Sequence, residues 1–212
     1  AVGAGDLKAA GAAAWQSLLL AACCGLATGL AGAATAAGVC RLLGADATVA
    51  PLATGYLQVT FAGSFTVFLL FIASSALQGA GDTVTPMKAM VLATVLNFVL
   101  DPILIFGLGG IPRLGVAGAA LATVLAQAIA AADLLTPPFR GRMTGFHLDA
   151  EARRLQPLLA WRLLWIGLPS SGQMLLRSLM SLVLMRIVAG AGTAAVAAYG
   201  IGMRYHMIVL AP

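Results

Sequence analysis

The residues best suited to chemistry in this sequence are an amide and a carboxylate, Asn97 and Asp101, inside a segment otherwise made of apolar side chains. If the segment is helical, a spacing of four residues places both side chains on one face, one turn apart. A carboxylate in the middle of an apolar span needs a partner, a proton, a bound cation or water. Oxygen ligands suit a hard cation such as sodium, and a carboxylate alone can carry a proton. We therefore predict a cation site at this pair, with a carboxylate that only packs against a neighbouring helix as the alternative.

Composition places the chain in a membrane. Of its 212 residues 61% are hydrophobic and only 9% are charged, whereas a soluble domain carries about 25% charge. The net charge is +5, but the cations gather between apolar runs, which is typical of an orientation signal and not of a nucleic-acid surface. The lipid bilayer is thus the expected partner, and no nucleic acid is expected.

The apolar runs predict an all-α, polytopic transmembrane bundle, because a spanning helix needs about 20 residues. Five complete spans are expected, and a sixth begins near Ala194 and is cut off. The complete spans are predicted at 12–43, 48–78, 87–108, 114–135 and 162–189. Since the sequence starts without Met and stops inside an apolar run, we interpret it as a piece of a longer protein.

Three parts follow along the chain. Residues 1–135 hold four spans, 136–161 form the longest polar segment, and 162–212 hold one full span and the start of another. The side of the membrane that carries more cations should be cytoplasmic. If the segment 136–161 lies on that side, the side carries seven cations and the opposite side carries three. The seven are Lys8, Lys88, Arg140, Arg142, Arg153, Arg154 and Arg162.

The tetrapeptide GAGD occurs twice, at 3–6 and 79–82, and each copy opens a pair of predicted spans. Gly79 and Gly81 can end one helix, and Asp82 or Thr85 can cap the next. The repeat is therefore either shared cap chemistry or the trace of repeated helical hairpins, as in many transporters.

Several longer motifs resemble one known family in its order and spacing. They are LQGAGDTVTPM, NFVLDPILIFG, RLGVAGAALATVLAQ, IGLPSSGQMLLRS and AGTAAVAAYGIGMR. They look like the multidrug and toxic compound extrusion (MATE) transporters. The resemblance implies part of a twelve-helix, two-lobe protein: helices three to six of the first lobe, a cytoplasmic inter-lobe loop at 136–161, and the start of the second lobe.

The resemblance also implies roles for particular residues. Asn97 and Asp101 match the family's cation-binding pair on its fifth helix, and Tyr56 and Thr123 match a tyrosine and a threonine nearby. Tyr56 fits a bilayer-interface aromatic equally well, and Thr123 can instead bond back to its own helix. Some members of the family carry a glutamate on the seventh helix, and the matching position here is Arg177, which argues against a second cation site built on that glutamate in the other lobe.

Three further polar residues within the spans, Gln127, Gln173 and Arg177, are candidates for the substrate cavity. Both glutamines could equally hold helices together. Arg177 lies too deep in its span to reach the membrane surface easily, so we expect it to face protein or water.

The resemblance implies a secondary active exporter of amphiphilic or cationic molecules, driven by antiport with protons or sodium and working by alternating access. We expect no enzyme activity, no cofactor besides the coupling ion and no metal other than a possible sodium at Asp101 and Asn97. We further expect a monomer in the cell membrane. One alternative is a flippase for lipid-linked precursors. The other is an intramembrane aspartyl protease, since GAGD also matches that group's GxGD motif at Asp82.

Overall fold

The computed structural model describes residues 6–42, 48–110, 112–139, 154–190 and 198–202, and these ranges contain helices and no strand. The α-helices are α1 (Leu7–Leu42), α2 (Ala50–Ala62), α3 (Ser64–Gly79), α4 (Val84–Phe106), α5 (Val116–Phe139) and α6 (Pro157–Gly190), with a short 3-10 turn at Leu108–Gly110. The all-α prediction is confirmed. The chain divides into two compact units, residues 1–160 and 161–212, and each is described by itself.

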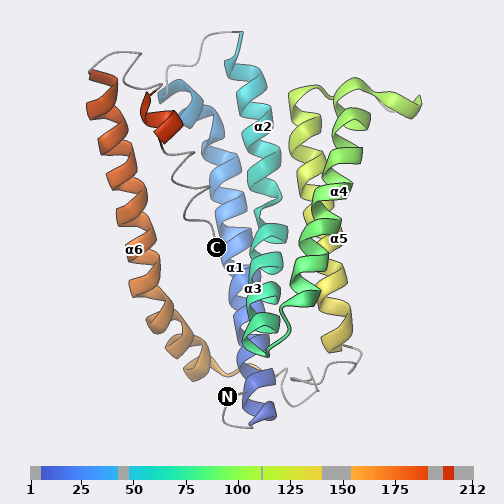
Figure 1. Ribbon diagram of the computed structural model, residues 1–212, viewed down its shortest axis with the longest axis vertical. Helices are drawn as coiled ribbons and strands as arrows, with labels where there is room; N and C mark the ends of the chain where they lie inside the picture. The colour runs from blue at the N-terminus through green and yellow to red at the C-terminus, as the bar shows by residue number, and fades with distance from the viewer. Residues whose placement is uncertain (1–5, 43–47, 111, 140–153, 191–197, 203–212) are drawn as a thin grey trace. The chain divides into compact units, whose positions relative to one another are not determined.

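Four helices are long and apolar enough to cross a membrane, and the bent pair α2–α3 adds a fifth crossing if it counts as one span. With that pair the number matches the five complete spans predicted. In the first unit, α1 runs beside α2 and α3, and α4 runs beside α5 (Figure 1). Most of the predicted sixth span lies outside the described residues.

The second predicted span, 48–78, is not one straight helix. It breaks at Gly63 into α2 and α3, which meet at an angle of 43°. A Cβ at Gly63 would lie 2.1 Å from Val124 Cγ2, so only glycine lets α5 approach here. Beyond the break, Ser64 Oγ donates to the Gly25 carbonyl of α1 at 2.8 Å, and Thr66 Oγ1 donates to the Gly63 carbonyl at 2.7 Å. The prediction missed this bend because the apolar pattern continues through it.

Close contact between α1 and the bent pair also depends on glycine. A Cβ at Gly25 would lie 2.8 Å from Phe65 Cα, and a Cβ at Gly29 would lie 2.8 Å from the Phe61 carbonyl oxygen. Two glycines four residues apart let neighbouring helix backbones approach closely in membranes. This spacing is visible in the sequence, although it did not enter the predictions.

Both copies of GAGD supply helix caps. Asp82 Oδ1 accepts hydrogen bonds from the backbone N–H groups of Val84 (3.1 Å) and Thr85 (2.9 Å) at the start of α4. Asp6 Oδ1 likewise accepts from Ala9 N at the start of α1. Gly81 has a φ of 92° and follows the end of α3, where Asp82 N donates back to the Leu77 carbonyl. The predicted cap role of Asp82 and Gly81 is confirmed, whereas Gly79 is the last residue of α3.

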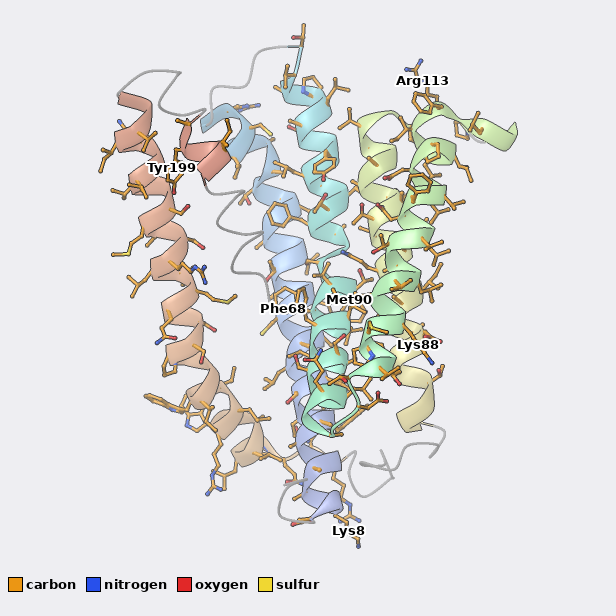
Figure 2. The ribbon with its side chains drawn as sticks, viewed as in Figure 1. Lys8, Phe68, Lys88, Met90, Arg113 and Tyr199 are labelled. Carbon is orange, nitrogen blue, oxygen red and sulfur yellow. The ribbon has the colours of Figure 1, made fainter. Side chains whose placement is uncertain are left out.

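The buried cluster of the first unit lies toward one end of its helices. It combines residues near the start of α1 and α4 with residues near the end of α3 and α5, among them Leu18, Leu77, Ala89 and Leu134. Lys8 and Lys88 lie at this end, and Arg113 lies at the opposite end (Figure 2). The predicted grouping of cations therefore agrees with the arrangement of these three residues.

The polar segment predicted at 136–161 is helical at both ends. Helix α5 continues to Phe139, and α6 begins at Pro157, five residues before the predicted span. Residues 140–153 lie outside the described part of the chain. The predicted lobes and the cytoplasmic position of this segment stay predictions.

Candidate cation site

The predicted pair lies on α4 where that helix packs against α5. The two helices run antiparallel and are joined at one end, where Leu114 N donates to the Leu104 carbonyl at 3.1 Å and Gly115 N to the Ile105 carbonyl at 3.2 Å. Gly118 is buried, and a Cβ there would lie 2.6 Å from the Leu104 carbonyl oxygen. This close approach sets the register between α4 and α5.

That register brings Asn97 to Thr123. Asn97 Nδ2 donates to Thr123 Oγ1 at 3.0 Å, and Thr123 Oγ1 donates in turn to the Ala119 carbonyl of its own helix at 3.0 Å. Thr123 thus bonds back to its own helix and also contacts the amide on α4, while its role in a cation site stays a prediction. The bond ties the two helices at the level of the predicted site.

Turning the Asn97 amide by 180° gives both of its polar atoms complementary partners, because in the first orientation its oxygen faces another acceptor. With its oxygen and nitrogen exchanged, Nδ2 donates to Asp101 Oδ2 at 3.3 Å, and the amide oxygen accepts from Thr123 Oγ1 at 3.0 Å. Asn97 therefore stands between Asp101 and Thr123 and can present either a donor or an acceptor to the carboxyl group. A donor facing Asp101 suits the ionised carboxyl group, and an acceptor facing it suits the protonated one.

The other carboxyl oxygen of Asp101 is the unusual feature of the site. Oδ1 is buried and has no hydrogen-bond partner among the described residues. A buried polar oxygen without a partner costs about 1–3 kcal/mol, and more when it is charged. Pro102 follows directly inside α4, and it has no N–H to donate to the carbonyl one turn earlier. A proton or a cation at Asp101 would remove the cost of the unpartnered oxygen.

Two other predicted site residues lie on neighbouring helices. Gln127 is one turn beyond Thr123 on the same face of α5. Tyr56 is on α2 and is 39% exposed, and its backbone carbonyl accepts a hydrogen bond from Thr60 Oγ1 at 2.8 Å. Among the described residues no hydrogen bond joins Tyr56 to Asn97 or Asp101, so its role in the site stays a prediction.

Gln173 and Arg177 belong to the second compact unit, on α6. They lie four residues apart, one turn along the helix, and both are exposed within their unit. Their predicted place in a substrate cavity, and the predicted inward orientation of Arg177, stay predictions.

One polar residue with a clear structural role was missed. Gln16 is 2% exposed, on α1, and its Nε2 donates to the Arg154 carbonyl at 2.7 Å. This bond holds Arg154, which lies just before α6, against the start of α1. An amide inside an apolar run was the available signal, but the sequence does not indicate which distant carbonyl it would meet.

Comparisons with known proteins give the same family as the motifs. The MatE family model matches residues 1–103. Across 97% of its length the chain superposes, with a TM-score of 0.84 and 31% identity, on 45% of a solved structure described as an outward-facing multidrug resistance MATE family transporter. The chain belongs to the MATE family. The resemblance given by the motifs is thereby confirmed.

Two curated MATE relatives show the range of the family. The chain is 33% identical over 178 residues to an FAD transporter of Shewanella oneidensis, which covers 80% of this chain and 37% of that protein. It is 30% identical over 216 residues to the probable multidrug resistance protein NorM of Thermotoga maritima, which covers all of this chain and 45% of the relative. The chain thus spans less than half the length of these MATE proteins.

Proposed function

We propose that the protein to which this chain belongs is a secondary active exporter of amphiphilic or cationic molecules in the cell membrane. The support is membership of a transporter family together with relatives described as multidrug resistance proteins. Export runs by alternating access between two lobes, with the protein acting as a monomer. The relative described as an FAD transporter widens the cargo class to larger, negatively charged molecules.

The coupling ion binds at Asp101. The single observation that supports this is the buried Oδ1 without a partner among the described residues, next to an amide that can turn. When Asp101 is ionised, Asn97 Nδ2 donates to Oδ2 and the amide oxygen accepts from Thr123. When Asp101 carries a proton, its O–H donates to the amide oxygen, and Nδ2 donates to Thr123. Turning one amide thus satisfies both states of the carboxyl group.

A sodium ion would use the same atoms differently. It would take the free Oδ1 of Asp101 and the amide oxygen of Asn97 as ligands, since hard cations prefer oxygen. The proton needs only the carboxylate, whereas sodium needs the second oxygen. Asn97→Ala therefore distinguishes the two ions: it should weaken sodium-driven export more than proton-driven export.

The test is export by the full-length protein in vesicles, driven by a proton gradient or a sodium gradient. Asp101→Asn removes the charge but keeps the shape, so coupled export should fall at least tenfold while the protein still reaches the membrane. Asp133→Asn is the matched control, because Asp133 is an exposed aspartate on α5 outside the site. Wild-type export by Asp101→Asn with its ion dependence intact would contradict the proposal.

The structure favours neither alternative. For the aspartyl protease, the carboxylate of Asp82 is engaged with the first N–H groups of α4 and with Thr85 Oγ1, which is cap chemistry. For the flippase, the cation Arg177 within its span is in the second unit, and no cluster of cations is found beside it on the described part of α6. Transport by antiport is therefore the only function we propose.

A further inference from the structure

Helix α6 is too long for one membrane crossing. It has 34 residues, which at 1.5 Å per residue is about 51 Å, against a hydrocarbon core of about 30 Å. The part after the internal proline, residues 169–190, is by itself about 33 Å long and so is enough to cross the bilayer. Residues 157–168, about 18 Å of helix, are left over.

The leftover part carries one compact group of side chains. Leu158, Trp161, Arg162 and Trp165 are spaced by three and four residues, so they share one face. The Trp161 and Trp165 rings meet edge to face with centroids 6.2 Å apart. Both indoles are more than half exposed, at 58% and 59%, and Leu158 is 67% exposed. We call these four residues the α6 anchor.

Helix α1 is also longer than one membrane crossing, and protein covers residues near its start. Helix α1 has 36 residues, and near its start Ala10, Ala14 and Leu18 are buried in the core of the first unit. None of the described residues of α6 is buried, so exposure does not distinguish the α6 anchor from the rest of the helix. Its two indoles and its arginine do. Two large indoles with an arginine between them need a surrounding that is apolar on one side and charged on the other.

We propose that residues 157–168 form an interfacial helix whose anchor binds the headgroup layer of an anionic phospholipid membrane. The two tryptophans lie at the level where headgroups meet acyl chains, as membrane-interface tryptophans do. Arg162 pairs with lipid phosphates, and the charge complementarity is with the anionic lipids of the cytoplasmic leaflet. Pro169, which interrupts the helix hydrogen bonding, separates this surface segment from the crossing segment.

The proposed arrangement differs from the sequence-based prediction in where the fifth span begins. The predicted span began at residue 162, which would have put Trp165 and Ile166 inside the hydrocarbon. In the proposed arrangement the crossing begins at Pro169, so Arg177 lies about 12 Å into the bilayer. The inference does not depend on the transport proposal, because it concerns only where α6 meets lipid.

Depth can be measured by quenching of tryptophan fluorescence with brominated phosphatidylcholine. The full-length protein is reconstituted with Trp161 and Trp165 as its only tryptophans, the others being changed to Phe. Bromines close to the headgroup should quench these indoles more strongly than bromines at the chain ends. A matched sample that keeps only Trp15, which packs against the buried core, should be quenched weakly by both. The proposal is wrong if neither lipid quenches the anchor, as when another helix or a second copy covers it, or if the chain-end bromines quench it more.

Headgroup charge is tested by a second, independent measurement. Vesicles of phosphatidylcholine with a minority of phosphatidylglycerol are extracted in mild detergent, and the lipids retained by the protein are counted by native mass spectrometry. Arg162→Gln should lower the preference for phosphatidylglycerol about fivefold. Arg186→Gln, which removes a cation near the other end of α6, should leave the preference unchanged. Equal retention by Arg162→Gln and the wild type, or an equal loss in both variants, would overturn the proposal.

Discussion

Asn97 on α4 and Thr123 on α5 are joined by a hydrogen bond of 3.0 Å between Nδ2 and Oγ1. This bond links the candidate cation site to the neighbouring helix, because the same amide also reaches Asp101 Oδ2 at 3.3 Å when it is turned. A change in the hydrogen bonding of the Asp101 carboxyl group can therefore reach α5 through the Asn97 side chain alone.

Removing the Thr123 hydroxyl should weaken the site without abolishing it. In Thr123→Val the Asn97 amide loses its partner on α5 and no longer has a fixed orientation toward Asp101. We expect the half-saturating ion concentration for export to rise about fivefold to tenfold, since a hydrogen bond contributes about 1 kcal/mol. Thr94→Val is the control, because within the described part of the chain Thr94 Oγ1 bonds to the Met90 carbonyl of its own helix and to no other helix. Unchanged ion dependence in Thr123→Val would contradict a role for this bond.

Separating α4 from α5 should damage both stability and the site. In Gly118→Ala the new methyl group would lie 2.6 Å from the Leu104 carbonyl oxygen, so the helices must move apart. We expect a loss of about 1–3 kcal/mol in stability, measured by thermal unfolding of the full-length protein in detergent. Gly38→Ala, also in a helix but with nothing within 4 Å of the new Cβ, should be neutral or slightly stabilising. Equal melting temperatures for the two variants would refute the close approach.

The cap of α4 should make stability depend on acid pH. Hydrogen bonds from the Thr85 side chain and backbone lower the pKa of Asp82 below its usual value. A lowered pKa in the folded state adds stability above the unfolded pKa of about 3.9, and this stability is lost as pH falls through the folded pKa.

The cap prediction is checked by melting temperatures of the full-length protein across acid pH. In Thr85→Val the melting temperature should fall less steeply with decreasing pH, because the variant lacks the side-chain bond that lowers the pKa of Asp82 most. Thr83→Val should keep the wild-type profile, since Thr83 makes no side-chain cap bond. The assignment of the cap fails if both variants follow one curve.

The predicted orientation can be tested by labelling single cysteines in intact cells. In a background without Cys23, Cys24 and Cys40, a cysteine at Arg113 should react with an impermeant maleimide from outside. A cysteine at Lys88 should react only after the membrane is opened, because Lys88 and Arg113 lie at opposite ends of the first unit (Figure 2). The opposite labelling pattern would invert the topology, and labelling of both would contradict the arrangement itself.

A third cysteine, at Arg142, tests the predicted inter-lobe segment. It should behave like the one at Lys88, since the sequence predicts that 136–161 is cytoplasmic. Modification of this cysteine in intact cells would show that the segment lies outside, whatever the result at the other two positions.

The sequence by itself determined the features that depend on one helix at a time. Apolar run length predicted the spans, four-residue spacing predicted that Asn97 and Asp101 share a face, and the Gly-Asp motif predicted the cap at Asp82. Each of these follows from the fixed rise and rotation of a helix or from hydrogen bonding within a few residues. The chain's family also followed from local motifs.

Only the tertiary structure decided which helices meet and in what register. The contact of Gly118 with Leu104 sets α5 so that Thr123 reaches Asn97. Tyr56, also a candidate in the sequence, makes no hydrogen bond with the pair within the described residues. Gly63, where α2 and α3 meet, packs against Val124, 61 residues away in the chain, and Gln16 bonds to the carbonyl of Arg154. Hydrophobic periodicity indicates which face of a helix is buried, but it carries no information about rotation and sliding between helices. Those are fixed by the side chains and glycines that meet at each crossing.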